Sequence, residues 1–98
     1  MLEKLYQEAM IVEMELNGLK VDKNCRVPVE YRGKSIGEYF IDLLVEDTVI
    51  LELKSIERHV PVFDAQILSY MKLTGKKVGL LINFNSKMVK DGIKRFVL

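Results

Sequence analysis

The sequence has no tryptophan, and it holds one cysteine and one histidine among 98 residues. A single cysteine, Cys25, excludes an internal disulfide and is typical of a protein from a reducing compartment. A single histidine, His59, argues against a zinc site built from several His and Cys ligands. Aromatic residues do not alternate with basic ones as they do in proteins that stack single strands, so sequence-specific recognition of nucleic acid is not indicated.

Long apolar runs are also missing. No segment approaches the roughly 18 apolar residues that a membrane-spanning helix needs, and the acidic, helical N-terminus does not resemble a signal peptide. Apolar residues make up 49% of the chain and charged residues 30%, as in ordinary globular domains. We therefore expect one domain over residues 1–98, located in the cytoplasm and with no membrane partner.

The net charge is +1, but the charge is unevenly distributed. Residues 1–57 hold seven Lys or Arg and twelve Asp or Glu, a balance of −5. Residues 58–98 hold eight Lys or Arg and two Asp, a balance of +6. The basic half could bind an anionic partner or could be a solvated surface, and the composition is compatible with both interpretations.

Hydrophobic periodicity predicts a first helix over residues 2–17. Its apolar residues recur at helical spacing, and Asn17-Gly18 follows as a stop signal. A second helix is expected between Pro61 and Gly75, because proline is favoured in a first helical turn and glycine after the last one. The apolar stripe of the first helix consists of Leu5, Ala9, Val12 and Leu16, broadened by Leu2, Tyr6, Met10 and Ile11.

Four or five strands account for the rest of the chain. Pro28 favours an edge position for the first of them. The resulting order, α-β-β-β-α-β, predicts an α/β fold with a mixed sheet flanked by helices. The strands are expected as two within residues 25–45 around a turn at 32–34, then residues 48–54 and 76–84, and an edge strand at 93–98.

The second and third strands carry charged residues inside apolar runs. Asp42 lies on the second strand, and Glu52 and Lys54 lie on the third. Side chains alternate between faces along a strand, so matching the two uniformly apolar faces places these three residues together on the other face. A three-residue turn at 46–48 would put Asp42 opposite Glu52, with their Cβ atoms about 4.5–5.5 Å apart. The apolar face of the second strand would consist of Tyr39, Ile41, Leu43 and Val45.

Two carboxylates this close repel each other, so a positive charge must offset them. A divalent cation would do so, because Mg²⁺ binds one or two carboxylates together with water and phosphate oxygens. Lys54 would then orient the attacking water or stabilise negative charge during hydrolysis of a phosphodiester. An ion pair of Lys54 with Asp42 or Glu52 explains the same residues without a metal, and both interpretations stay open at this point.

The order of these motifs resembles the PD-(D/E)XK nuclease superfamily. Asp42 followed by Glu52-x-Lys54 matches its name motif, with Ile41 where the name has proline. Gln66-x-x-x-Tyr70 looks like the glutamine–tyrosine motif of RecB-like nucleases. Five ordered stretches are also similar to the GxxExxY protein family and together cover nearly the whole chain: "LEKLY", "GEYFIDLLVED", "VILELK", "AQILSYMKLTG" and "VGLLINF".

This resemblance implies a restriction-endonuclease-like core and a metal-dependent nuclease that uses Mg²⁺ or Mn²⁺. Its partner would be nucleic acid, DNA rather than RNA. By motif, Asp42 and Glu52 would bind the metal, Lys54 would serve the attacking water, and Gln66 would support the site from the second helix.

The name motif of the GxxExxY family adds residues from the first helix. Glu3 and Tyr6 match its Glu and Tyr, so Glu3 would be a further metal ligand, and Tyr6 and Tyr70 would have supporting roles. The glycine of the motif would fall one residue before Met1, so the domain is expected to be shortened at its N-terminus.

Two other functions are compatible with the sequence. The chain could be a non-catalytic nucleic-acid-binding module that retains the nuclease fold, with salt-dependent affinity and no metal-dependent turnover. It could instead be a protein-interaction module, for example a homodimer formed through one of the edge strands.

Overall fold

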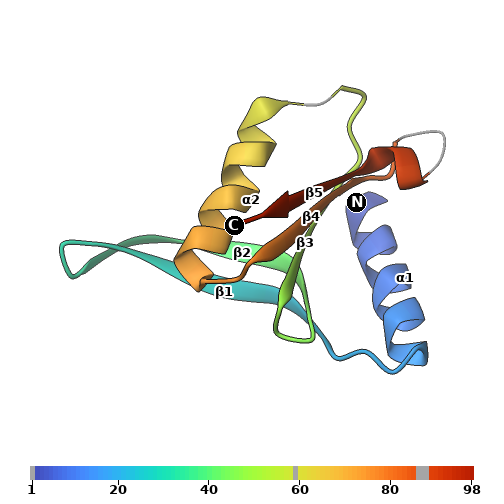
Figure 1. The fold of residues 1–98 in the computed structure, drawn as a ribbon, viewed down its shortest axis with the longest axis horizontal. Helices are drawn as coiled ribbons and strands as arrows, with labels where there is room; N and C mark the ends of the chain where they lie inside the picture. Colours follow the sequence, from blue (N-terminus) through green and yellow to red (C-terminus); the bar gives the residue numbers. More distant parts are fainter. Residues whose placement is uncertain (1, 59, 86–88) are drawn as a thin grey trace.

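A five-stranded mixed sheet forms the centre of the molecule, with one helix on each face (Figure 1). The computed structural model describes residues 2–58, 60–85 and 89–98. The order of elements confirms the predicted α/β fold, with a final edge strand. The elements are α1 (Leu2–Leu16), β1 (Val21–Tyr31), β2 (Lys34–Val45), β3 (Val49–Lys54), α2 (Pro61–Thr74), β4 (Val78–Asn83), the 3-10 helix η1 (Val89–Gly92) and β5 (Ile93–Val97).

The strands lie in sequence order across the sheet, β1-β2-β3-β4-β5. β3 and β4 are parallel and are connected through α2, whereas the other neighbours are antiparallel. β1 and β5 are the two edges, as predicted from Pro28 and from the position of the last strand. β1 begins at Val21 rather than at Cys25, because Val21, Asp22 and Lys23 also pair with β2.

The turn between β2 and β3 has the predicted length. Val45 pairs with Val49, which leaves residues 46–48 as a three-residue connection. Glu46 and Asp47 both take left-handed conformations, with φ of 54° and 57°. The regular pairing ends at Leu43 and Leu51, and one step further along the backbone N–H of Asp42 bonds to the side chain of Glu52.

The strict alternation predicted for β2 is wrong at one point. Leu43 and Val45 pack on the α1 face, but Ile41 packs on the other face with residues of α2. The change of face falls at Asp42, and the neighbouring strand has Asn24 in a left-handed conformation, with φ of 52°. The register between β1 and β2 does not shift there, so the change of face occurs without a β-bulge.

α1 lies over the face of the sheet that holds Leu43, Val45, Leu51 and Leu53. Its contacts come from Met10, Ile11 and Met14. The four residues that define the stripe in the sequence, by contrast, lie on the exposed side of the helix: Leu5, Ala9, Val12 and Leu16. The helix itself is confirmed, but it is rotated so that Tyr6, Met10 and Ile11 face the core.

α2 covers the opposite face at close range. Ile67 and Met71 are fully buried there against β4, which carries Gly79 at the point of contact. A Cβ atom on Gly79 would lie 2.9 Å from Sδ of Met71 and 3.0 Å from Cδ1 of Ile67. Glycine at this position therefore sets how near α2 can approach the sheet.

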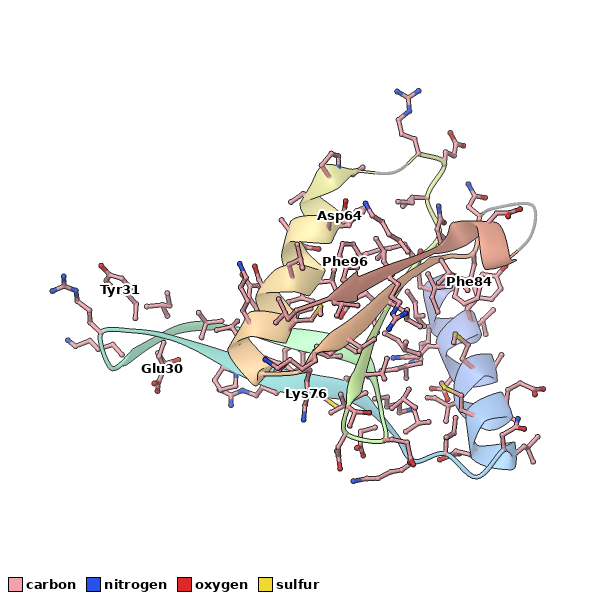
Figure 2. All side chains as sticks on the ribbon, in the orientation of Figure 1. Glu30, Tyr31, Asp64, Lys76, Phe84 and Phe96 are labelled. Carbon is pink, nitrogen blue, oxygen red and sulfur yellow. The ribbon has the colours of Figure 1, made fainter. Side chains whose placement is uncertain are left out.

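β1 and β2 extend beyond the sheet as a two-stranded arm (Figure 1). β2 pairs with β1 from Lys34 onwards but with β3 only through residues 43–45. Glu30 and Tyr31 stand at the far end of the arm (Figure 2). Of the helices in the described ranges, none is long and apolar enough to cross a membrane.

Candidate functional site

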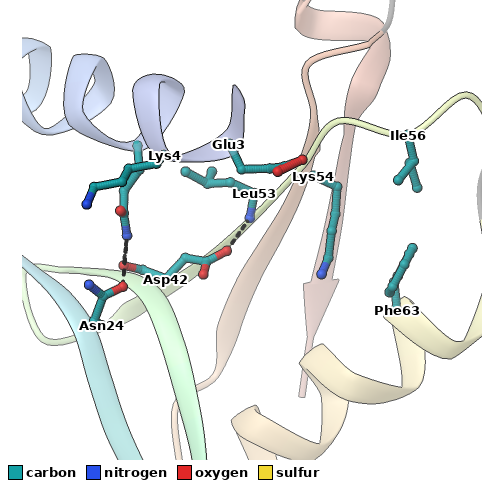
Figure 3. Close-up of a pocket in the computed structure, with 9 residues that line it drawn as sticks. Glu3, Lys4, Asn24, Asp42, Leu53, Lys54, Ile56 and Phe63 are labelled. Atoms are coloured by element: carbon teal, nitrogen blue, oxygen red, sulfur yellow. Dashed lines mark hydrogen bonds between the residues drawn. The ribbon is translucent and has the colours of Figure 1, made fainter. Parts of the chain in front are cut away.

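A pocket of about 550 Å³ opens where α1, the base of the arm, the end of β3 and the start of α2 meet (Figure 3). It combines carboxylate, amide and amine side chains with a few apolar ones. The lining residues are Glu3, Lys4, Gln7, Asn24, Asp42, Leu53, Lys54, Ile56 and Phe63. Two of the four predicted catalytic residues, Asp42 and Lys54, are among them.

Asp42 is held in place by hydrogen bonds to both its side chain and its main chain. Its Oδ2 accepts a hydrogen bond from the backbone N–H of Leu53 at 2.8 Å. Its carbonyl oxygen accepts one from Nε2 of the buried Gln7, also at 2.8 Å, and the same Nε2 donates to Oδ1 of Asn24 at 3.2 Å (Figure 3). β3 thus holds the carboxylate of Asp42 and α1 holds its main chain, while Asn24 of β1 accepts the second hydrogen bond of Gln7.

Glu52 lies beneath Asp42 and is only 5% exposed. Its Oε1 accepts a hydrogen bond from the backbone N–H of Asp42 at 3.4 Å. Burial raises the pKa of Glu52 to about 9, and the charge of Asp42 acts in the same direction, whereas the charge of Lys54 lowers it. The Glu52 carboxyl is therefore protonated near neutral pH.

Lys54, at the end of β3, brings a positive charge to the same pocket. Its Nζ lies 4.4 Å from the centre of the Phe63 ring, which α2 supplies from its first turns. A cation over an aromatic face is attracted by the ring quadrupole, an interaction of about 0.5–2 kcal/mol. Phe63 therefore favours an orientation of the Lys54 side chain towards α2 and the pocket (Figure 3).

The remaining predicted residues are distributed around this centre. Glu3 lines the pocket from the first turn of α1, whereas Gln66 is half-buried on α2 and does not line it. Tyr70 is buried next to Tyr39, with 4.9 Å between ring centres, and burial followed by the charge of Glu52 raises its pKa to about 12. Tyr6 stacks on Phe84 at 4.1 Å and so fixes α1 against the end of β4.

Comparison with protein-family models matches residues 1–96 to the PD-(D/E)XK nuclease superfamily. The chain belongs to this superfamily. A search of curated proteins finds no match. The mixed sheet between two helices and the order of elements are consistent with the PD-(D/E)XK fold.

Enzymes of the PD-(D/E)XK superfamily typically use divalent metals. Asp42 and Glu52 offer hard carboxylate oxygens, the ligands that Mg²⁺ and Mn²⁺ prefer. Within the described ranges, no three His, Cys, Asp or Glu side chains gather into a group that could hold a metal. Two carboxylates are sufficient for Mg²⁺ when water and phosphate oxygens complete the coordination, and the residues fit such an ion.

Several pocket residues of this PD-(D/E)XK domain were not predicted from the sequence: Lys4, Gln7, Asn24 and Phe63. Gln7 had a detectable signal, since a glutamine within one turn of Met10 and Ile11 on the inward side of a helix is a polar group among apolar ones. Asn24 had a weaker one, because asparagine within a strand is favoured where the backbone turns left-handed. Lys4 and Phe63 have no such signal, because only the packing of α1 and α2 brings them to the pocket.

Proposed function

We propose that the chain is a metal-dependent nuclease that hydrolyses phosphodiester bonds of DNA. The proposal depends chiefly on one observation. Asp42 lines the pocket, the buried Glu52 accepts a hydrogen bond from its backbone N–H, and Lys54 reaches the same pocket two residues after Glu52. A structural ion pair would not require a second acid buried beside the first, at a considerable cost in desolvation.

In this proposal Asp42 and Glu52 bind Mg²⁺ or Mn²⁺. Glu3, which lines the same pocket from α1, would assist the ion although no three-carboxylate group is preformed among the described residues. The ion, when bound, would neutralise charge on the phosphate and on the carboxylates. Asp42 needs no rearrangement to take part, because Leu53 and Gln7 already fix its position. Glu52 would give up its proton, since carboxylates bind metals in the ionised form.

Lys54 would act on the substrate side of the site. Its ammonium group can donate hydrogen bonds to the attacking water and to a phosphate oxygen that gains negative charge in the transition state. Water attacks phosphorus, the bond between phosphorus and the leaving oxygen breaks, and that oxygen takes up a proton. Lys4, exposed at the same pocket, would bind a neighbouring phosphate.

Gln66 would support this arrangement from α2, one turn before Tyr70, whose ring packs beside Tyr39. Tyr6 would maintain the position of α1 through its contact with Phe84. The motif order also supports membership of the GxxExxY family within the superfamily, with Glu3 and Tyr6 as the residues of its name.

Cleavage assays with matched variants test the proposal. Double-stranded DNA, single-stranded DNA and RNA would each be incubated with wild type, Asp42→Ala and Lys54→Ala in Mg²⁺ or Mn²⁺, with EDTA as a blank. Both substitutions should reduce DNA cleavage by about 100-fold or more, because each removes a charged group from the reacting centre. Lys72→Ala, which changes an exposed lysine on α2 outside the pocket, should cleave at the wild-type rate.

Equal cleavage by wild type, Asp42→Ala and Lys54→Ala would contradict the proposal, as would cleavage that persists in EDTA. Salt-dependent DNA binding without any turnover would instead support a non-catalytic nucleic-acid-binding module.

A further inference from the structure

The base of the β1–β2 arm forms one wall of the pocket, through Asn24 and Asp42. Two residues further out along β2 lies Phe40, which pairs with Arg26 of β1. Two residues of an extended strand span about 7 Å. A nucleotide next to a phosphate held at Asp42 can therefore reach the ring of Phe40.

Phe40 lies on the side of the arm that faces away from α2. Its two neighbours pack on the α2 side, Tyr39 against the ring of Tyr70 and Ile41 within the core beneath α2. Successive side chains of a strand point to opposite faces, so Phe40 points the other way. This is the side of the sheet on which α1 lies and from which Gln7 reaches the base of the arm.

The ring of Phe40 is 51% exposed, although phenylalanine is among the residues that domains usually bury. A substrate has to pass the base of the arm to reach Asp42, so the surface beside Asp42 is open to nucleic acid whenever the pocket is. Aromatic side chains at such positions stack on bases, because every base has a flat π-face.

Positive charge lies at both ends of the path from the pocket to the tip of the arm. Arg26 is not part of it, because its Nε donates to Glu38 and its charge is already balanced. The tip carries two exposed cations against one acid, Glu30 (Figure 2). The cations of the pocket are Lys4 and Lys54, and those of the tip are Arg32 and Lys34.

A single strand that leaves the pocket along the arm would thus meet phosphate-binding groups at its ends and an aromatic ring between them. The sequence shows no alternation of aromatic and basic residues, because these groups come from α1, β2, β3 and the tip. Only the fold aligns them.

We propose that Phe40 stacks on an unpaired base next to the phosphate in the pocket, so that the substrate is single-stranded DNA. This inference rests on the proposed nuclease function, which supplies DNA as the substrate. A paired base would first have to leave its stack, which costs free energy, and fully paired DNA is therefore the poorer ligand.

Tryptophan fluorescence tests the contact directly, because the chain contains no tryptophan. Phe40→Trp places a single fluorophore at the site and keeps an aromatic ring there. Titration with a 20-nucleotide oligothymidylate, in EDTA to prevent metal-dependent cleavage, should quench its emission with saturation. Leu73→Trp, at a residue of α2 that is 47% exposed, should keep its emission.

Fluorescence anisotropy with the labelled oligothymidylate, also in EDTA, measures the affinity. Phe40→Leu keeps an apolar side chain but removes the ring, and it should weaken binding about tenfold, as expected for the loss of one base stack. Phe40→Trp should bind at least as tightly as wild type, and Leu73→Ala should match wild type.

The same assay compares single and double strands. A duplex of the oligothymidylate with its complement should bind wild type about tenfold or more weakly than the single strand. Phe40 and Leu73 are both exposed, so circular dichroism and thermal melting should show folded protein for every variant.

Unquenched emission in Phe40→Trp, wild-type affinity in Phe40→Leu, or equal binding of duplex and single strand would overturn the proposal. None of these measurements involves cleavage, so the two proposals can fail separately. Cleavage that requires Asp42, together with wild-type binding by Phe40→Leu, would overturn base stacking alone. Weakened binding by Phe40→Leu in a protein that cleaves no DNA would confirm the stacking contact and contradict the nuclease function.

Discussion

Asp42 and Glu52 are joined through the main chain of Asp42, whose N–H donates a hydrogen bond to Oε1 of Glu52 at 3.4 Å. The side chain of Asp42 in turn accepts a hydrogen bond from the N–H of Leu53, the residue after Glu52. Each acid thus accepts a hydrogen bond from a backbone N–H of the opposite strand. Both bonds lie just beyond Leu43 and Leu51, the last regular pair of β2 and β3. The carboxyl groups are part of the hairpin itself, and substitutions at either position affect structure as well as chemistry.

Stability should fall as pH rises from 6 to 9. The folded-state pKa of Glu52 is about 9 and its ordinary value is 4.5, so the folded protein holds a proton that the unfolded chain has lost in this range. This proton contributes fully to the free energy of unfolding below pH 4.5. Between pH 4.5 and 9 that contribution decreases by up to about 1.4 kcal/mol per pH unit. Urea unfolding at four pH values measures the slope.

Glu52→Gln should flatten this pH dependence, because the amide cannot titrate. Glu30→Gln, on the exposed arm, should keep the wild-type slope. Identical slopes in wild type and Glu52→Gln would show that another group is responsible.

Metal binding should release protons. If Mn²⁺ binds to both carboxylates at pH 7.5, the proton on Glu52 must leave, so close to one proton should be released per ion. Calorimetric titrations in two buffers that differ in ionisation enthalpy give this number directly.

Asp42→Ala should abolish the binding heat, whereas Asp47→Ala in the β2–β3 turn, an exposed aspartate outside the pocket, should retain it. No binding by wild type up to roughly 30 mM Mn²⁺, far above the range of functional metal sites, would leave the carboxylates as a structural pair only.

Gln7 should act on the site through Asp42. Gln7→Met keeps the length of the side chain but removes the donor to the Asp42 carbonyl and to Asn24, which should lower the free energy of unfolding by about 1–3 kcal/mol. Residues that orient metal ligands typically alter metal affinity by about 10–100-fold, and we expect a weakening in this range. Urea unfolding and calorimetry measure the two effects.

Glu13→Met on the outer side of the same helix serves as the control and should change neither quantity appreciably. Wild-type metal affinity in folded Gln7→Met would limit Gln7 to a structural role.

Gly79→Ala should destabilise the domain by about 1–3 kcal/mol, because the added methyl group meets buried atoms of α2. Ile67→Val removes Cδ1, one of the atoms in the clash, so the alanine should cost less in that background. A thermodynamic cycle of the two single variants and the double variant measures this coupling. Strict additivity would mean that α2 moves as a whole and that Ile67 is not the obstacle.

The sequence was sufficient to predict the hairpin at the centre of the site. Apolar residues on both sides of the turn had to share a face, and this requirement alone selected the three-residue turn at 46–48 and the register that places Asp42 opposite Glu52. The order of elements followed from hydrophobic periodicity and from the helix start and stop signals Pro61 and Gly75. The structure places these two residues at the start and end of α2.

The rotation of α1 could not be predicted in the same way. The helix has two apolar sides, one with Leu5, Val12 and Leu16 and one with Met10, Ile11 and Met14, and hydropathy does not distinguish which of them meets the sheet. The change of face at Asp42 was missed for a related reason. Alternation describes a regular strand, whereas here β2 changes face at Asp42, beside a left-handed Asn24 on the neighbouring strand.

The strand connections have a consequence for the order in which the chain folds. Asp42, Glu52 and Lys54 lie on one hairpin with a short turn. The parallel pair β3–β4, by contrast, can form only when the longer connection through α2 brings the two strands together. Short-range hairpins close in microseconds, and long-range parallel pairing is slower. We expect pulsed hydrogen exchange during refolding to protect the amide of Leu53 before the amides of Val78–Asn83. The acids would then meet while water still surrounds them, and their desolvation would be among the last steps of folding.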